Sequence, residues 1–337
     1  MVRYLVSRVL QAAGVLWAAF TVSFGVLYLL PSDPVSMAAS ADNGTPVDAA
    51  AIAELQARYG LDQPVWTQYR NALGSAIRGD FGTSISTGQS VTDAIGAALP
   101  STVVLASTAL TAAVVGGTAV ALLATYTRIG WLRNALLSVP PLGVAVPTFW
   151  VGLILLQVFS FRLKLVPAFG DQSIEHLILP AITLALPVSA VIAQVLAASL
   201  TSTWRQPFIE AARAKGASRL RIQMRHALRL SSIPAFTIAG VLVGSLLAGS
   251  VVVETVFSRA GIGRLTQMSV MAQDIPVVQG IVVFSAAVFV LVNLAVDLLY
   301  PLIDPRIVGA RRRQGVAPEV ERAPAAHDAD LEVKALV

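Results

Sequence analysis

The chain has 337 residues, of which only 13% are charged and 55% are hydrophobic, and its formal net charge is +5. Soluble domains average roughly 25% charged residues, so this composition excludes an ordinary soluble enzyme. It also excludes disorder as the main state, which needs high charge and low hydrophobicity. The sequence contains no cysteine, which excludes disulfides, thiolate metal sites and cysteine nucleophiles.

Six stretches of the chain contain no Asp, Glu, Lys or Arg, and together they make up almost half of it. A membrane helix needs about 20 apolar residues and two spans need about 40, so we assign one helix to each stretch. The sequence therefore predicts an all-α polytopic membrane protein with six transmembrane helices. The stretches are Val9–Leu30, Ala94–Thr127, Asn134–Phe161, Leu177–Trp204, Leu230–Val253 and Ile275–Val296.

The first stretch resembles a signal peptide only superficially. Val9–Leu30 is longer than a usual signal-peptide core, and Pro31–Pro34 offers no cleavage site with small residues. We expect it to be a retained span.

The basic residues predict the orientation. Of the 24 Lys and Arg residues, 17 lie before the first span, in the 126–133 turn, in the 205–229 loop and in the C-terminal segment. The alternate loops hold the other seven. Because cytoplasmic loops carry the excess of positive charge, both termini are expected in the cytoplasm. The net positive charge then belongs to loops beside the membrane and does not indicate a nucleic-acid partner.

Residues 31–99 form one extracytoplasmic segment in this topology. Pro46 opens a helix that Gly60 closes, and a second helix is expected from Asp62 to about Ile77. A turn follows at Gly79–Thr83, and the chain is expected to enter the membrane near Pro100. These helices form either a lid or docking surface or a simple packing layer on the span ends.

Two spans contain internal prolines, and one carries a row of small residues. Pro140, Pro141 and Pro147 are expected to kink the third span, and Pro180 and Pro187 the fourth. Gly240, Gly244 and Ala248 recur at a spacing of four in the fifth span, which indicates close helix packing.

Signs of catalysis are missing from the sequence. The three histidines form no HExxH motif, no Gly-x-Ser-x-Gly elbow occurs, and no GxxxxGK[ST] loop is present. The chain therefore has no P-loop with which to bind ATP, and we expect no metal, cofactor or catalytic residue in it. The span interiors hold no carboxylate for a proton relay, since Glu254 and Asp297 lie at span ends.

The cytoplasmic loop at 205–230 is the most informative segment. Pro207 suits the first position of a helix and Gly216 its closing position, which predicts a helix of about nine residues, roughly 13 Å long. Ser218 can cap a second helix, on which Arg221, Arg225 and Arg229 recur at a spacing of four. Such a short, stiff helix suits insertion into a groove of a partner protein. The alternative is a basic loop lying on anionic lipid.

Glu210, Ala211 and Ala212, followed after three residues by Gly216, resemble the EAA loop of permease subunits of bacterial ABC importers. The further matches resemble the first, B-type permease of the dipeptide, oligopeptide and nickel branch and cover about residues 1–308. Ile233 and Pro234 follow Gly216 by 17 and 18 residues, a longer spacing than in the general EAA pattern and one usual for this branch. The matching segments are Leu29–Pro34, Tyr59–Pro64, Gly79–Gly82, Val146–Trp150, Arg213–Gly216, His226–Arg229, Ile233–Pro234, Val253–Phe257, Gly261–Gly263, Asp297–Tyr300 and Asp304–Arg306.

The resemblance implies a type I ABC-importer permease fold over residues 1–308, while the tail 309–337 matches nothing and is expected to be disordered. It also implies a second homologous permease, two ABC ATPase subunits that bind ATP and Mg, and an extracytoplasmic substrate-binding protein, in a bacterial plasma membrane. Glu210, Ala211, Ala212 and Gly216 would form the coupling helix, with Arg213 and Lys215 as polar contacts to the ATPase.

The substrate stays open at this stage. Di- or oligopeptides are the first expectation, and nickel chelates, haem or another small solute are alternatives within the branch. Gln157, Gln194 and Asn293 either line a path or make contacts between helices. A secondary carrier or channel acting alone and an embedded hydrolase are remote alternatives.

Overall fold

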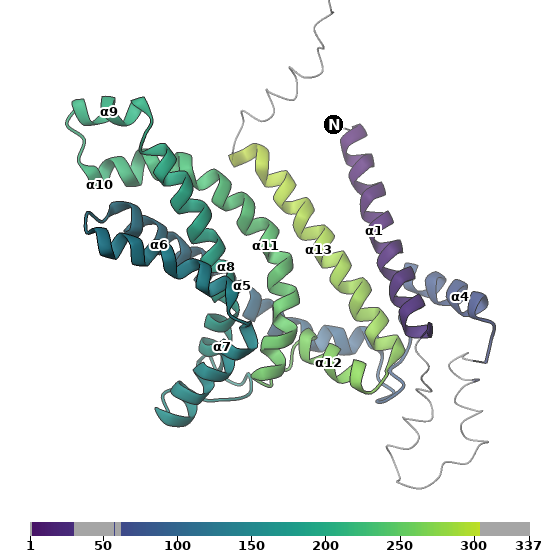
Figure 1. The fold of residues 1–337 in the computed structure, drawn as a ribbon. Helices are drawn as coiled ribbons and strands as arrows, with labels where there is room; N and C mark the ends of the chain where they lie inside the picture. The colour runs from purple at the N-terminus through teal and green to yellow at the C-terminus, as the bar shows by residue number, and fades with distance from the viewer. Residues whose placement is uncertain (1, 30–56, 58–61, 304–337) are drawn as a thin grey trace, which may run out of the picture. The chain divides into compact units, whose positions relative to one another are not determined.

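The computed structural model describes residues 2–29, 57 and 62–303 (Figure 1). In this part of the chain every regular element is helical, and the single β-type pairing is an isolated bridge between Thr83 and Ser90. The all-α prediction is therefore confirmed. The helices are α1 (Val2–Leu29), α4 (Val65–Ile77), α5 (Val91–Tyr126), α6 (Gly130–Ala145), α7 (Thr148–Leu155), α8 (Glu175–Thr203), α9 (Pro207–Ala214), α10 (Arg219–Arg221), α11 (Leu228–Val256), α12 (Ile262–Met271) and α13 (Ile275–Ile303), with π-helical turns at Leu156–Arg162 and Ile222–Ala227.

Five helices are long and apolar enough to cross a membrane, and a sixth span results if one bent helix pair is counted as a single crossing. The five correspond to five of the predicted spans, and the bent pair corresponds to the predicted span Asn134–Phe161. The described residues up to Val296 belong to one compact unit. Beyond Asp297 the structure describes only the end of α13, and the predicted tail 309–337 lies outside the described residues.

The third span is broken and not merely kinked. Helix α6 and the segment Thr148–Arg162 meet at an angle of 104°. The break occurs at Val146, which is extended with φ −82° and ψ 130° and precedes Pro147. A proline disfavours the helical conformation of the residue before it, so Pro147 ends α6. Pro140 and Pro141 lie within α6 and do not end it.

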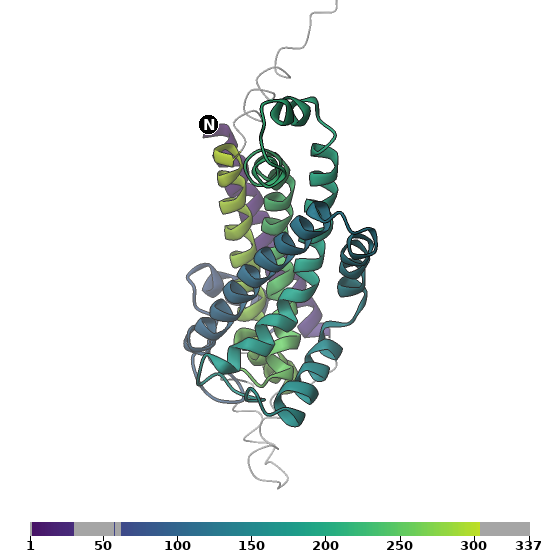
Figure 2. The same ribbon diagram turned by 90° about the vertical axis from the view of Figure 1, so that its left-hand side faces the viewer.

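The core forms where α5 and α11 pack on α8. Leu105 and Ala109 of α5, Leu184 and Ile192 of α8 and Leu246 of α11 all belong to one buried cluster. In Figures 1 and 2, α5 runs obliquely across the neighbouring long helices. Helix α8 therefore forms the centre of the bundle and runs from one end of the bundle to the other.

Small residues allow α5 to approach α8 closely. Ala109, Ala113, Gly117 and Ala121 recur at a spacing of four and are all buried. A Cβ atom on Gly117 would lie 2.6 Å from the Ser189 carbonyl oxygen of α8. The sequence pointed to small-residue packing in the fifth span, where Gly244 indeed faces Phe289 of α13. The longer row of small residues, however, lies on α5.

Two groups of short elements lie at opposite ends of the bundle, which we call the α9 end and the α12 end (Figure 1). The α12 end also carries α4, which begins at Val65, three residues later than the predicted Asp62, because Pro64 is its N-cap. The predicted turn after α4 is confirmed, since Gly79 and Gly82 have φ of +79° and +77°. The predicted helix between Pro46 and Gly60 lies outside the described residues.

Helix α4 packs on α1 through aromatic rings. Tyr69 lies edge-on to Phe20 at 5.7 Å and to Phe24 at 5.3 Å, measured between ring centroids. The Tyr69 hydroxyl forms a 2.9 Å hydrogen bond with the Thr21 hydroxyl. Trp66 stacks on Tyr69 with 5.6 Å between the ring centroids and is 72% exposed. Helix α4 is therefore anchored on the first span.

Candidate functional site

Helix α9 follows α8 closely in the chain, and the residues at its start explain why a helix begins there. Gln206 precedes it in an extended conformation, and Pro207 occupies its first position. Proline suits this position because its missing N–H would have no partner within the helix. The prediction of a helix opened by Pro207 is confirmed, and the helix is one residue shorter than expected.

Gly216 ends this helix. Its φ is +77°, a left-handed conformation that favours glycine. The Gly216 N–H donates to the Arg213 carbonyl at 2.9 Å, and the Ala217 N–H donates to the Ala212 carbonyl at 3.1 Å. Together these bonds form a Schellman motif, which satisfies carbonyl groups at a helix end. Both ends of α9 are thus defined by Pro207 and Gly216, the two residues from which the sequence predicts this helix.

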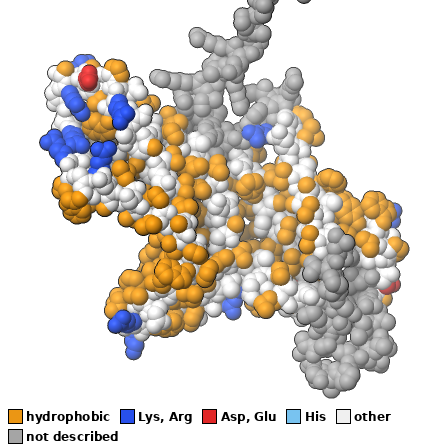
Figure 3. All heavy atoms as spheres, in the orientation of Figure 1, with side chains coloured by type: hydrophobic (Ala, Val, Ile, Leu, Met, Phe, Trp, Pro, Cys, Tyr) orange, Lys and Arg blue, Asp and Glu red, His pale blue; other side chains and the backbone are white. Residues whose placement is uncertain are grey.

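One side of α9 is seated on the ends of the spans. Ile209 is 1% exposed and packs in a buried cluster with Leu196 and Leu200 of α8 and Ile222 of the following π-helical turn. Ala212 packs against the same cluster. The opposite side is open, and Figure 3 shows Lys and Arg side chains gathered at this end. Of the predicted coupling residues, five are exposed: Glu210, Ala211, Arg213, Lys215 and Gly216.

Trp204 connects α8, α9 and α10. The guanidinium carbon of Arg213 lies 5.6 Å from the centre of the Trp204 ring, and that of Arg219 lies 5.7 Å from it. Both distances are within the range of cation–π attraction. Arg213, which the resemblance assigns as a contact to the ATPase, therefore also has an intramolecular partner.

The loop after α9 is bonded to the end of α5. The Gln223 side-chain amide donates to the Leu122 carbonyl at 2.9 Å, and an Arg219 guanidinium nitrogen donates to the Thr125 carbonyl at 3.3 Å. Gln223 is 2% exposed, so its amide is held where water does not compete. Sequence reasoning missed Trp204, Arg219 and Gln223. In the sequence, Gln223 stands out as a polar residue beside the apolar Ile222. This position indicates a buried polar contact, but it does not identify Leu122 as the partner.

The predicted second helix is short. Ser218 caps it as expected, and its hydroxyl accepts a bond from the Arg221 N–H at 3.4 Å. The helix continues into the π-helical turn Ile222–Ala227 and then into α11. The three predicted arginines, Arg221, Arg225 and Arg229, are all exposed.

A second polar cluster lies at the α12 end. Glu254, in the last turn of α11, is fully buried. Its carboxylate accepts bonds from the Thr102 hydroxyl of α5 at 2.7 Å and from the Gly263 N–H at 2.7 Å. The Thr102 hydroxyl in turn accepts a bond from the Ile262 N–H at 2.8 Å. The first N–H groups of α12 have no partner within their helix, so Glu254 and Thr102 supply those partners and join three helices.

Two glycines make room for this carboxylate. A Cβ atom on Gly261 would overlap the Glu254 carboxylate, and one on Gly263 would overlap the Val251 backbone. The close approach of α12 to α11 therefore requires glycine at both positions. The resemblance had singled out these glycines and Glu254, but not their contact.

The loop after α4 is held by a buried carboxylate as well. Asp274, between α12 and α13, is 1% exposed and accepts bonds from the Ser86 hydroxyl at 2.7 Å and from the Ile85 N–H at 3.2 Å. The Ser84 hydroxyl donates to the same carboxylate. Separately, Arg259, between α11 and α12, is 3% exposed and donates to the Ser101 hydroxyl at 3.2 Å. Burial lowers the pKa of the Arg259 guanidinium, and the charges of Asp171 and Glu254 oppose this shift.

Both parts of the chain match known membrane components. Residues 113–309 match the family described as binding-protein-dependent transport system inner membrane component, and residues 1–106 match the N-terminal part of such components. The first match alone covers more than half of the chain. The chain belongs to this family of transport permeases. It is a permease subunit of an ABC importer, and the ATPase activity of such importers resides in partner subunits.

Individual relatives agree with this assignment. The permease is 36% identical over 307 residues to the glutathione transport system permease protein GsiC of Escherichia coli K12, covering 91% of this chain and 99% of the relative. The corresponding protein of Shigella boydii serotype 4 is 35% identical over 307 residues. Among solved structures, the MetNI methionine ABC transporter in an inward-facing conformation has a TM-score of 0.50 at 15% identity, covering 64% of this chain and 96% of that chain. At that identity the likeness concerns the fold alone, and it confirms the predicted ABC-importer permease fold.

Two of the three polar residues expected either on a path or between helices make bonds within their own helices. The Gln194 side-chain amide donates to the Ala190 carbonyl at 3.3 Å, and the Asn293 amide donates to the Phe289 carbonyl at 2.9 Å. Gln157 is exposed. The assignment of the three residues to a path or to contacts between helices stays a prediction.

Proposed function

We propose that this permease translocates di- or oligopeptides, using ATP hydrolysis by two partner ATPase subunits. Support comes from the relatives, because glutathione, which names their transport system, is a tripeptide. The resemblance of the sequence motifs to the dipeptide and oligopeptide branch points the same way. An importer of this family depends on a binding protein, ATPase subunits and a second permease.

We further propose that α9 is the coupling helix that meets the ATPase. The single observation that carries this proposal is the geometry of the helix. Ile209 and the Gly216 motif hold it rigidly on the span ends, while Glu210 and Ala211 face outward. A rigid helix transmits a displacement at its outer face to the helices on which it is seated. ATP-driven closure of the ATPases would thus move α8 and α11 and open the path alternately to each side.

The orientation follows from the same placement. The proposal puts the α9 end in the cytoplasm, and Figures 1 and 2 show that α1 begins at this end too. Its loops hold a large share of the basic residues, from Arg128 and Arg133 to the seven in residues 205–229. The positive-inside rule favours a cytoplasmic position for such loops. Both termini are then cytoplasmic, and ATP and Mg are bound by the ATPases, since this chain has no P-loop.

The absence of cysteine allows a direct test of the coupling role. A photoreactive maleimide attached to an Ala211→Cys variant, in the assembled transporter, should crosslink to an ATPase subunit. Gln172→Cys is the matched control, because Gln172 is also exposed but precedes α8 at its opposite end. Crosslinking to the ATPase from Gln172 and not from Ala211 would refute the proposed coupling helix and the orientation together.

The substrate is tested on the binding protein that copurifies with the native complex. Mass spectrometry of its bound ligand should identify a di- or oligopeptide. A nickel chelate or haem at full occupancy would overturn the peptide assignment and leave the coupling role untouched.

A further inference from the structure

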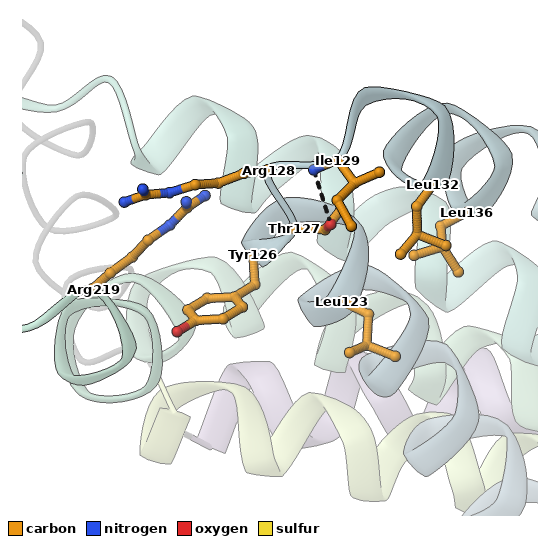
Figure 4. Close-up of a pocket in the computed structure, with 8 residues that line it drawn as sticks. All are labelled: Leu123, Tyr126, Thr127, Arg128, Ile129, Leu132, Leu136 and Arg219. Carbon is orange, nitrogen blue, oxygen red and sulfur yellow. Dashed lines mark hydrogen bonds between the residues drawn. The ribbon is translucent and has the colours of Figure 1, made fainter.

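A cavity of about 600 Å³ opens at the α9 end beside the turn that joins α5 to α6 (Figure 4). Its volume lies within the roughly 300–1,000 Å³ that is usual for ligand sites. The end of α5, the start of α6 and Arg219 of α10 surround it. The coupling residues of α9 do not line it, so it is separate from the site proposed above.

One wall of the cavity is apolar. Leu123 of α5, Ile129 of the turn and Leu132 and Leu136 of α6 line it. Leu123 is 57% exposed and Ile129 is 51% exposed. In a bilayer such side chains contact acyl chains without cost, because lipid tails are as apolar as leucine.

The opposite wall is basic. Arg128 and Arg219 both line the cavity, and in the view of Figure 4 their side chains extend toward each other. Among the residues that the structure places around the cavity, none is acidic. Two guanidinium groups that share one cavity without a lining carboxylate form a site for an anion, and guanidinium groups bind phosphate through paired hydrogen bonds.

The Arg219 side chain is held in place by its surroundings, and Arg128 lies on a hydrogen-bonded turn. The guanidinium carbon of Arg219 lies 5.2 Å from the centre of the Tyr126 ring, and one of its nitrogens bonds to the Thr125 carbonyl. The turn that carries Arg128 is closed by a bond from the Ile129 N–H to the Thr127 hydroxyl at 3.2 Å, drawn dashed in Figure 4. A preorganised site loses less conformational entropy when it binds a ligand.

Aromatic residues near the cavity favour a position at the level of the lipid headgroups. Tyr126 is the last residue of α5 and is 40% exposed, and Trp131, near the start of α6, is 73% exposed. Tyr and Trp are enriched at the membrane–water interface. The leucine wall then faces the acyl region, and the arginines lie where phosphate groups of lipids reside.

We propose that this cavity binds one anionic phospholipid, with its phosphate on Arg128 and Arg219 and an acyl chain against Leu123, Leu132 and Leu136. Basic pockets between helices on the cytoplasmic side of a membrane protein bind lipid headgroups in this manner. The assignment to the cytoplasmic leaflet rests on the proposed orientation. The apolar wall favours a lipid over free phosphate, and the lack of lining carboxylates favours an anionic lipid over a zwitterionic one.

Native mass spectrometry of the assembled transporter tests the proposal. The complex is loaded with dioleoyl phosphatidylglycerol or with dioleoyl phosphatidylethanolamine, which have the same acyl chains. We expect retention of phosphatidylglycerol, and Arg128→Gln should lower its retention about tenfold, the effect of losing a charge-assisted hydrogen bond. Arg133→Gln is the matched control, because Arg133 is exposed in the first turn of α6 and does not line the cavity.

A second variant shows whether a loss of lipid retention results from misfolding. Ile129→Glu brings a carboxylate to a half-exposed position at the cavity and should abolish retention of phosphatidylglycerol while the complex stays assembled. Equal retention by Arg128→Gln and Arg133→Gln, or equal retention of the two lipids, would overturn the proposal. Displacement of the lipid by inorganic phosphate alone, or crosslinking of Ile129→Cys to a partner subunit in a lipid-free complex, would do the same. The readout is lipid retention, so a failure of the proposed coupling role at α9 would leave it unchanged.

Discussion

The Glu254 carboxylate accepts a 2.7 Å hydrogen bond from the Thr102 hydroxyl, although the two residues are 152 positions apart. This contact joins the end of α11 to α5. Both residues also accept hydrogen bonds from backbone N–H groups at the start of α12. A buried carboxylate is stable in such a place only when hydrogen bonds replace its lost hydration. The cluster therefore acts as a structural joint between three helices.

Removing this carboxylate should destabilise the α12 end. Glu254→Ala leaves the Gly263 N–H and the Thr102 hydroxyl without their acceptor, at a cost of about 1–3 kcal/mol for each buried group. Glu254→Gln keeps the shape and should lose less. The midpoint of thermal unfolding of the purified complex measures both effects. Glu175→Gln, an exposed carboxylate in the first turn of α8, is the control and should leave the midpoint unchanged. An unchanged midpoint for Glu254→Ala would show that the joint contributes nothing.

Two adjacent glycines of α5 should respond in opposite ways to substitution. A Cβ atom on Gly117 would lie 2.6 Å from the Ser189 carbonyl oxygen, whereas one on Gly116 would meet nothing within 4 Å. Gly117→Ala should therefore push α5 from α8 and destabilise the protein by about 1–3 kcal/mol. Gly116→Ala should stabilise the helix by roughly 0.5–1 kcal/mol, because alanine is the better helix former. The two variants are compared by denaturation in the same detergent, and a shift in the same direction for both would contradict the packing of α5 on α8.

Substitutions in α9 should uncouple ATP hydrolysis from transport. Gly216→Pro cannot adopt the φ of +77° found there, because the proline ring holds φ near −65°. Gly216→Ala should have a milder effect, since alanine reaches the left-handed region at a cost of about 1 kcal/mol. Glu210→Lys reverses a charge on the exposed face. We expect Gly216→Pro and Glu210→Lys to reduce substrate uptake by proteoliposomes severely, with normal amounts of permease in the membrane. Normal uptake by both variants would exclude a coupling role.

The bond between Gln223 and the end of α5 should control the rigidity of the coupling loop. Gln223→Met keeps the length of the side chain but removes the donor to the Leu122 carbonyl. The expected loss is about 1 kcal/mol, as for a typical hydrogen bond, and faster hydrogen exchange across residues 204–222. Gln206→Met is the control, because the Gln206 side chain is exposed and makes no capping bond. If both variants exchange at the rate of the unmodified protein, the bond is not what holds the loop.

Local signals predicted much of this protein. Uninterrupted apolar stretches located the spans, since the length of a membrane helix follows from the thickness of the bilayer. Pro207 and Gly216 correctly located the ends of α9, because each acts on the backbone within a few residues. The sequence did not show which of three prolines would break the third span, because Pro140 and Pro141 are accommodated within α6 while Pro147 ends it.

The sequence alone thus determined the helical membrane fold, its family and the position of the loop with the coupling signature. The tertiary structure decided what that loop is attached to, how Glu254 is satisfied and where an apolar wall meets two arginines. Gln223 and Leu122 are 101 positions apart, and Arg219 and Thr125 are 94 apart. Such pairs form only when α5 packs on α8 through its small residues. That packing depends on the shapes of two helix surfaces, which no local pattern of residues specifies.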